Sequence, residues 1–144
     1  MQIVELGLTT INKDKKKIMK RFLKSFACAF NGICVTFKSE QNFRLYLVAM
    51  SIAIVMGLIL KLAMPAWGLV IFSSGLVLVA ELFNTAVERL GDEIANGKQK
   101  QVVKNIKDIS AAAVLISALT AFVIGILFLL IPFIQRMLGL MQSH

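Results

Sequence analysis

The stretch LVLVAELFNTAVERLGDE, residues 76–93, places acidic and amide side chains in an otherwise apolar helix. Its most informative polar residues are spaced by three, four and four positions: Glu81, Asn84, Glu88 and Asp92. At the helical period this spacing puts all of them on one face. Because a carboxylate in or near lipid is costly, such residues are usually functional. The stretch therefore predicts a helix whose polar face carries chemistry.

The position of this face along the helix predicts a gradient from lipid to water. The preceding residues, 62–80, are uncharged and long enough to form most of a membrane span. Glu88 and Asp92 lie ~10 Å and ~16 Å beyond Glu81 along the helix axis. Glu81 is therefore expected below the cytoplasmic membrane surface. Such a gradient suits a reaction between a membrane-embedded alcohol and a soluble phosphate donor.

The composition of the whole chain is that of a membrane protein. It has 144 residues, of which 58% are hydrophobic, and a mean hydropathy of +0.78. Predicted membrane-spanning helices cover about residues 42–61, 66–90 and 107–135. Each is long enough to cross ~30 Å of hydrocarbon. We therefore expect an all-α membrane protein with three transmembrane helices.

The N-terminal part is expected to lie outside the hydrocarbon. Residues 1–14 are interpreted as a flexible tail, and residues 15–144 as a single membrane domain. From about residue 15 to residue 38, apolar residues recur at helical spacing, with lysines elsewhere on the helix. This pattern predicts an amphipathic helix on the inner membrane surface.

The basic residues also predict the topology. They are dense before and at the start of the first span and again between the second and third spans. The short first connection has only Lys61, and the C-terminal tail only Arg136. The positive-inside rule then puts the N-terminus and residues 91–104 in the cytoplasm. Because this topology and anionic lipids explain the net charge of +8, no nucleic-acid partner is expected.

Two further groups are expected at the same depth as Glu88. Glu40 stands at the start of the first span, and Mg²⁺ typically binds one or two carboxylates plus phosphate oxygens. Taken alone, Glu40 also fits a favourable interaction with a helix N-terminus. Lys107, next to Asp108, is placed to hold a phosphate, although alone it would be an interfacial anchor. For Asn84 the alternative role is helix packing in an oligomer.

Together these residues resemble the small prokaryotic diacylglycerol kinase family, which includes the undecaprenol kinases. The family pattern E-x-x-N-[ST]-A-[IV]-E-x-x-x-D stands here between Glu81 and Asp92. The resemblance extends over about residues 20–130. It includes KSFACAFNGI at 24–33, SEQNFR at 39–44 and KDISAAAVLI at 107–116.

The resemblance implies a lipid kinase that uses ATP with Mg²⁺ as cofactor. It implies a homotrimer with active sites between subunits, in a prokaryotic cytoplasmic membrane. Glu81 would be the catalytic base, and Glu40 and Glu88 the metal ligands. The implied ATP-binding positions are Arg21, Cys28, Lys107 and Asp108. The remaining implied roles are support of the site for Asn84 and Asp92, and lipid-substrate contact for Arg44.

Departures from the family pattern and the choice of substrate leave alternatives open. Cys28 stands where the family often has an aromatic residue, and Arg89 and Gly91 stand where it is usually apolar. The segments SEQNFR and NTAVE resemble the undecaprenol-kinase branch more than the diacylglycerol branch. This resemblance favours undecaprenol as the acceptor, with diacylglycerol as the alternative. A carrier that uses Glu81 for ions or protons, or a structural subunit, are the non-enzymatic alternatives.

Overall fold

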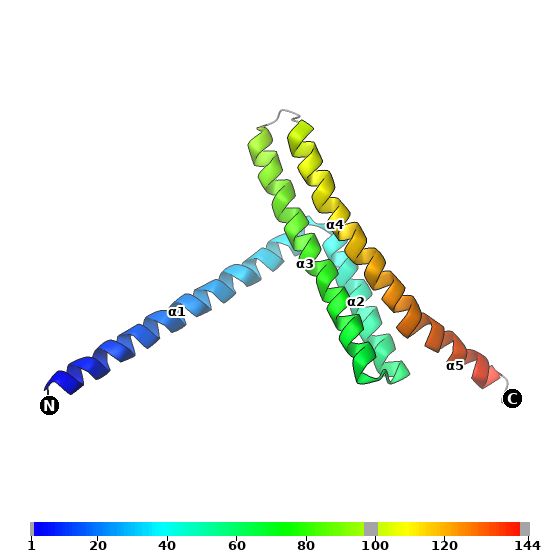
Figure 1. Ribbon diagram of the computed structural model, residues 1–144, viewed down its shortest axis with the longest axis horizontal. Coiled ribbons are helices and arrows are strands. Elements are labelled where there is room, and N and C mark those ends of the chain that lie inside the picture. The colour runs from blue at the N-terminus through cyan, green and yellow to red at the C-terminus, as the bar shows by residue number, and fades with distance from the viewer. Residues whose placement is uncertain (1, 97–100, 142–144) are drawn as a thin grey trace. The chain divides into compact units, whose positions relative to one another are not determined.

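The structure, a computed structural model, describes the backbone of residues 2–96 and 101–141 and the side chains of 15–96 and 101–139. Helices alone build this described part, which confirms the expected all-α class (Figure 1). The elements are α1 (Gln2–Ser39), α2 (Gln41–Leu60), α3 (Met64–Ala95), α4 (Gln101–Gly125), the π-helical turn η1 (Ile126–Leu130) and α5 (Ile131–Met141).

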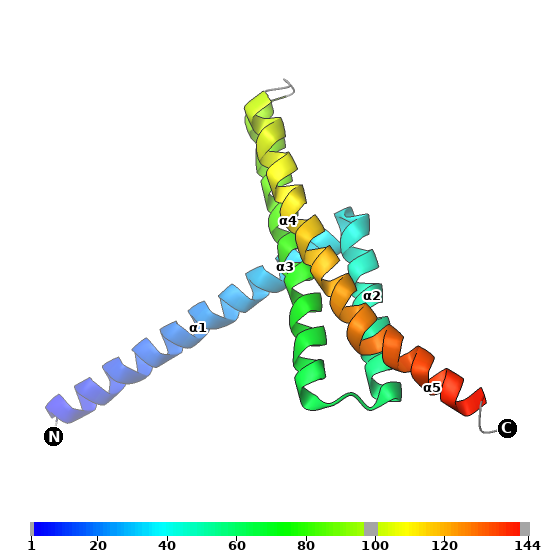
Figure 2. The same cartoon turned by 45° about the vertical axis from the view of Figure 1, so that its right-hand side comes forward.

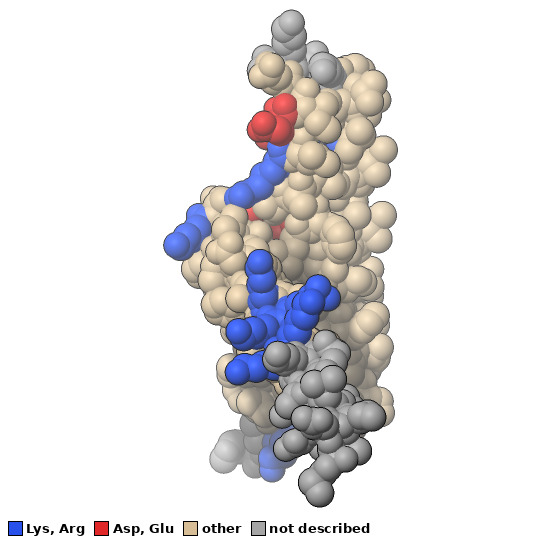
Figure 3. Space-filling view, turned by 90° about the vertical axis from the view of Figure 1, so that its left-hand side faces the viewer, with Lys and Arg blue, Asp and Glu red and all other residues tan. Residues whose placement is uncertain are grey.

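The chain divides between Ser39 and Glu40 into two units, which are described separately. The first unit is α1, whose backbone is helical from Gln2. The mobility expected for residues 1–14 and the single domain expected for 15–144 stay predictions. Along the described part of α1, exposed apolar residues recur at helical spacing: Ile18, Met19, Phe22, Leu23, Phe26, Phe30, Ile33 and Phe37. Lysine and arginine side chains gather on another part of α1: Lys16, Lys17, Lys20, Arg21 and Lys24 (Figure 3).

The second unit holds three segments long and apolar enough to cross a membrane: Gln41–Leu60, Met64–Ala95 and Gln101–Gly139. This confirms the three predicted transmembrane helices. With a rise of 1.5 Å per residue, α2 is ~30 Å long and α3 is ~48 Å long. Since the hydrocarbon core is ~30 Å thick, α3 is longer than the membrane requires.

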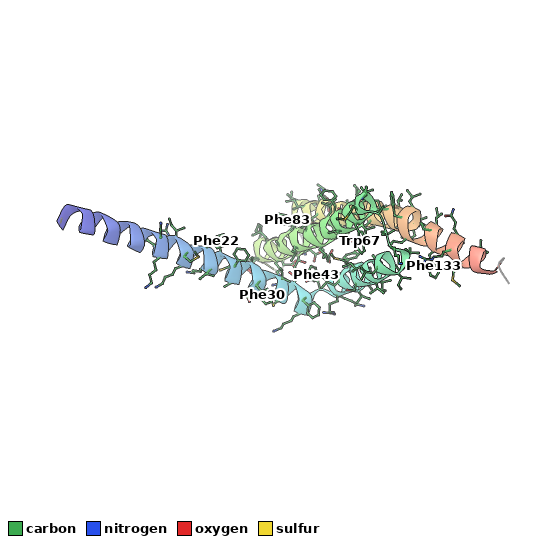
Figure 4. All side chains as sticks on the ribbon, turned by 90° about the horizontal axis from the view of Figure 1, so that it is seen from below. Phe22, Phe30, Phe43, Trp67, Phe83 and Phe133 are labelled. Carbon is green, nitrogen blue, oxygen red and sulfur yellow. The ribbon has the colours of Figure 1, made fainter. Side chains whose placement is uncertain are left out.

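A tight turn joins α2 to α3. Lys61 ends α2 in the left-handed conformation, with φ 52°, and the amide of Leu62 donates to the Gly57 carbonyl at 3.1 Å. Pro65 stands in the first turn of α3, where its missing N–H costs no helical hydrogen bond. A Cβ added at Gly57 would lie 2.8 Å from the ring of Trp67, which Figure 4 labels. Glycine at this position therefore allows the two helices to pack closely.

The α3 and α4 helices form the second hairpin. They run side by side near the connection between them, as the two views in Figures 1 and 2 agree. At Gly91 a Cβ would lie 3.1 Å from Val103 on α4, so a small residue suits the contact. Asn96 ends α3 with φ 46°, a conformation that asparagine tolerates better than most residues.

A π-helical turn interrupts the third span. Pro132 is the second residue after η1, and a proline in a helix removes an amide donor and crowds the carbonyl four residues earlier. In membrane helices a local π adjustment is one way to satisfy the freed backbone groups. Beyond this turn the Arg136 side chain donates to the Ile59 carbonyl at 3.3 Å, which connects α5 to the end of α2.

The apolar core of the second unit is narrow. Its buried apolar residues are Phe43, Ala66, Val70, Val77, Val114 and Leu129. Many large apolar side chains are exposed instead, such as Phe72, Phe83 and Phe122. An exposed apolar surface of this kind is expected where lipid tails or neighbouring helices cover the protein.

Candidate functional site

The polar face of α3 is buried at one end and exposed at the other. Glu81 is 2% exposed, Asn84 9% and Thr85 4%, whereas Asp92 is exposed. Glu88, between them, is half-buried. Counted from Met64, Glu81 lies ~26 Å along α3, close to the ~30 Å length of α2. The face thus begins close to the level of the first residues of α2 and continues beyond them.

A short chain of hydrogen bonds holds the middle of this face. The Ser110 hydroxyl on α4 donates to Oδ1 of Asn84 at 2.7 Å. Nδ2 of Asn84 in turn donates to Oε1 of Glu88 at 3.0 Å. Sequence reasoning gave Ser110, in the stretch KDISAAAVLI, no role and missed this contact. The sequence feature that could have indicated this contact is a hydroxyl side chain three residues after Lys107, at the start of an apolar segment.

The start of α2 lies close enough to Glu81 for its charged and polar groups to interact with that carboxyl group. The charges of Glu40, which precedes α2, and of Glu88 both act on the Glu81 carboxyl group. The Tyr46 hydroxyl on α2 also interacts with the charge of Glu81. The structure therefore brings Glu40, Glu81 and Glu88 close enough for their charges to interact. Sequence analysis missed Tyr46, because the position of a tyrosine within a predicted span does not indicate which residues of another helix it lies near.

Thr85 is also buried on this face and forms its hydrogen bond within α3. Its hydroxyl donates to the backbone carbonyl of Glu81 at 2.9 Å. This bond satisfies a buried hydroxyl within α3, so Thr85 costs little in an apolar setting.

The exposed end of the face meets the start of α4. Nζ of Lys107 pairs with Oδ1 of Asp92 at 2.5 Å, and their side chains are 30% and 73% exposed. An ion pair this exposed contributes little to stability, typically 0 to ~1 kcal/mol. Lys107 can therefore exchange Asp92 for another anion at small cost. Asp108, the neighbouring residue, is exposed.

The remaining predicted site residues are Arg44, Arg21 and Cys28. Arg44 is half-buried in the first turn of α2. Arg21 and Cys28 are exposed on α1, in the first unit, which is described by itself. Roles for all three stay predictions.

The carboxylates near Glu81 are possible ligands for a divalent cation. In residues 15–96 and 101–139, no group of three or more His, Cys, Asp or Glu side chains is arranged to hold a metal ion alone. Mg²⁺ bound to a nucleotide needs only one or two carboxylates, because phosphate oxygens and water complete its coordination. Glu40 and Glu88 fit that requirement in number and type, and the charges of both act on the Glu81 carboxyl group.

Comparison with known proteins gives three findings. Residues 27–129 match the family described as prokaryotic diacylglycerol kinase. A protein named undecaprenol kinase, from Bacillus subtilis (strain 168), is 33% identical over 119 residues, which is 83% of this chain and 96% of that protein. A protein named diacylglycerol kinase, from Synechocystis sp., is 30% identical over 127 residues, 88% of this chain and 73% of that protein.

Proposed function

Because this chain belongs to the prokaryotic diacylglycerol kinase family, we propose that it transfers the γ-phosphate of ATP to the hydroxyl of undecaprenol. The chain is a multi-pass membrane lipid kinase, a phosphotransferase. Undecaprenol is supported by the relative whose length the match covers almost completely. Diacylglycerol is the alternative acceptor, supported by the second relative.

One observation carries the chemistry: a buried carboxyl group, Glu81, shares a helix face with the half-buried Glu88. In the proposed reaction the lipid hydroxyl oxygen attacks the γ-phosphorus, and the bond from that phosphorus to the bridging oxygen of ADP breaks. The hydroxyl proton passes to the Glu81 carboxylate, which acts as general base. Catalysis of this kind depends on positioning and on neutralising charge.

Glu40 and Glu88 would hold the Mg²⁺ of Mg-ATP. When bound, this ion neutralises phosphate charge and orients the phosphate chain. Asn84 supports the proposal because its amide fixes one oxygen of Glu88. Lys107, with its exposed partner Asp92, suits a phosphate contact. The other proposed contacts are Arg21, Cys28 and Asp108 for ATP, and Arg44 for the lipid.

We also propose a homotrimer with active sites between subunits, in the cytoplasmic membrane with a cytoplasmic N-terminus. The exposed apolar side chains of the three spans leave ample surface for neighbouring subunits. The density of basic residues before the first span supports the orientation.

The test is a competition between acceptors. Purified protein in lipid nanodiscs receives radiolabelled ATP, Mg²⁺ and either undecaprenol or diacylglycerol at equal mole fraction, with Glu81→Gln protein as control. Higher kcat/KM for undecaprenol supports the proposal. Higher kcat/KM for diacylglycerol would replace the substrate but keep the enzyme class. Absence of any lipid product from well-folded protein would contradict the proposed reaction and favour a carrier or a structural subunit.

A further inference from the structure

Ser110 on α4 is connected to Glu88 on α3 through hydrogen bonds to and from Asn84. Its hydroxyl lies 2.7 Å from Oδ1 of Asn84 and 2.8 Å from the backbone carbonyl of Lys107. Asn84 is 9% exposed and donates to Glu88 at 3.0 Å. We propose that Ser110 is a positioning residue: it orients the Asn84 amide, and through it the Glu88 carboxylate that binds Mg-ATP.

The orientation follows from the chemistry of the three groups. An ionised carboxylate only accepts hydrogen bonds, whereas a carboxamide has a donor end and an acceptor end. With the Ser110 proton on Oδ1, the NH₂ group of Asn84 is directed to Glu88. The opposite orientation would point the amide oxygen at the carboxylate, and two acceptors repel. The proton that Ser110 donates to Oδ1 therefore reinforces the amide orientation that the Glu88 carboxylate requires.

Substitutions at Ser110 can separate its two hydrogen bonds, to Asn84 and to the Lys107 carbonyl. The hydroxyl has one proton for two acceptors, Asn84 and the Lys107 carbonyl. Ser110→Ala removes the donor to Asn84 without removing any helical backbone bond. Ser110→Thr keeps a hydroxyl that can bond either acceptor. Residues behind metal ligands typically change metal affinity or activity by ~10- to 100-fold when they are lost.

Another serine of α4 provides a matched control. Ser117 lies two turns further along, and its hydroxyl donates at 2.9 Å to the Ala113 carbonyl of its own helix. Ser117→Ala thus loses a hydroxyl of the same kind without touching the Asn84–Glu88 pair. A general effect of removing a serine from α4 would appear in both variants.

The experiment measures Mg²⁺ dependence and nucleotide binding in the full protein in nanodiscs. We expect Ser110→Ala to raise the Mg²⁺ concentration for half-maximal activity by ~10-fold, with Ser110→Thr and Ser117→Ala close to wild type. Calorimetric binding of a non-hydrolysable ATP analogue with Mg²⁺ should weaken by a similar factor in Ser110→Ala only. In an Asn84→Ala background, Ser110→Ala should have no further effect, because the connection to Glu88 is already cut.

The inference rests on the proposed function only in assigning Mg-ATP to Glu88, and the two can fail separately. Wild-type protein that phosphorylates neither lipid contradicts the proposed reaction, while the binding measurement still tests Ser110. Ser110→Ala protein with unchanged Mg²⁺ dependence and unchanged analogue binding would overturn the positioning role. So would a loss of equal size in Ser117→Ala, or a further loss on adding Ser110→Ala to Asn84→Ala.

Discussion

Glu81 and Glu88 occupy different environments on the same helix, and this difference separates their proposed roles. Glu81 is 2% exposed and lies closer than Glu88 to the middle of α3, at the depth proposed for the lipid hydroxyl. Glu88 is half-buried and bonded to Asn84, nearer to water and to a soluble nucleotide. A base must lie within hydrogen-bond reach of the proton it takes, whereas a metal ligand must reach the phosphates.

The first prediction concerns Glu81. Glu81→Gln keeps the shape of the side chain and removes its basicity, so turnover should fall ~100-fold or more while ATP binding stays nearly intact. Steady-state kinetics with calorimetric nucleotide binding measure both quantities. Loss of ATP binding with an unchanged rate at saturation would make Glu81 a nucleotide ligand instead.

The second prediction concerns Glu88. Glu88→Gln removes one anionic ligand, so the Mg²⁺ requirement should rise, or turnover should be lost, in protein that remains folded. A Mg²⁺ titration of activity, with circular dichroism to verify the helices, measures this. A control is Glu93→Gln, an exposed acid one residue beyond Asp92 that has no proposed role. An unchanged Mg²⁺ dependence in Glu88→Gln would remove Glu88 from the metal site.

At the scale of elements, each hairpin depends on a glycine at its closest contact. Gly57 accommodates the Trp67 ring between α2 and α3, and Gly91 accommodates Val103 between α3 and α4. The first contact lies beside the turn that joins α2 to α3, at the other end of α2 from Glu40. The second fixes where Lys107 lies relative to Asp92.

The third prediction is a packing test of the α2–α3 hairpin. The Cβ of Gly57→Ala would lie 2.8 Å from Trp67, so the ring must shift, at a typical overpacking cost of ~1–3 kcal/mol. Gly68→Ala is the matched control, since nothing lies within 4 Å of its added Cβ. It should be neutral or stabilising by ~0.5–1 kcal/mol. Denaturant unfolding in detergent measures both; equal stability of the two variants would contradict the close packing.

At the scale of the whole molecule, hydropathy predicted the number of spans because burial in lipid requires long apolar segments. It placed the second span at about 66–90, whereas α3 continues to Ala95, since a helix does not stop where the hydrocarbon does. The face containing Glu81 and Glu88 was predictable because helical periodicity is local. Ser110 and Tyr46 were missed because their contacts cross between helices, which periodicity along one helix does not reveal.

The fourth prediction concerns orientation in the membrane. With Cys28 and Cys34 replaced by serine, a cysteine at Asn96 should react with a membrane-impermeant reagent only from the cytoplasmic side. A cysteine at Lys61, in the other connection, is the control and should react only from outside. Labelling of Asn96→Cys from outside would overturn both the topology and the depths assigned to the acidic residues.

The unequal lengths of α2 and α3 bear on how the proposed product departs. A lipid hydroxyl is neutral and is tolerated at the depth of Glu81. A phosphate monoester, in contrast, carries almost two negative charges at neutral pH. Such a headgroup is strongly disfavoured in hydrocarbon and favoured in water. Because α3 extends ~18 Å past the length of α2, its polar face continues from Glu81 through Glu88 to the exposed Asp92. Partitioning of the charged headgroup into water would thus favour release of the proposed product from the site, while its apolar tail stays in the membrane.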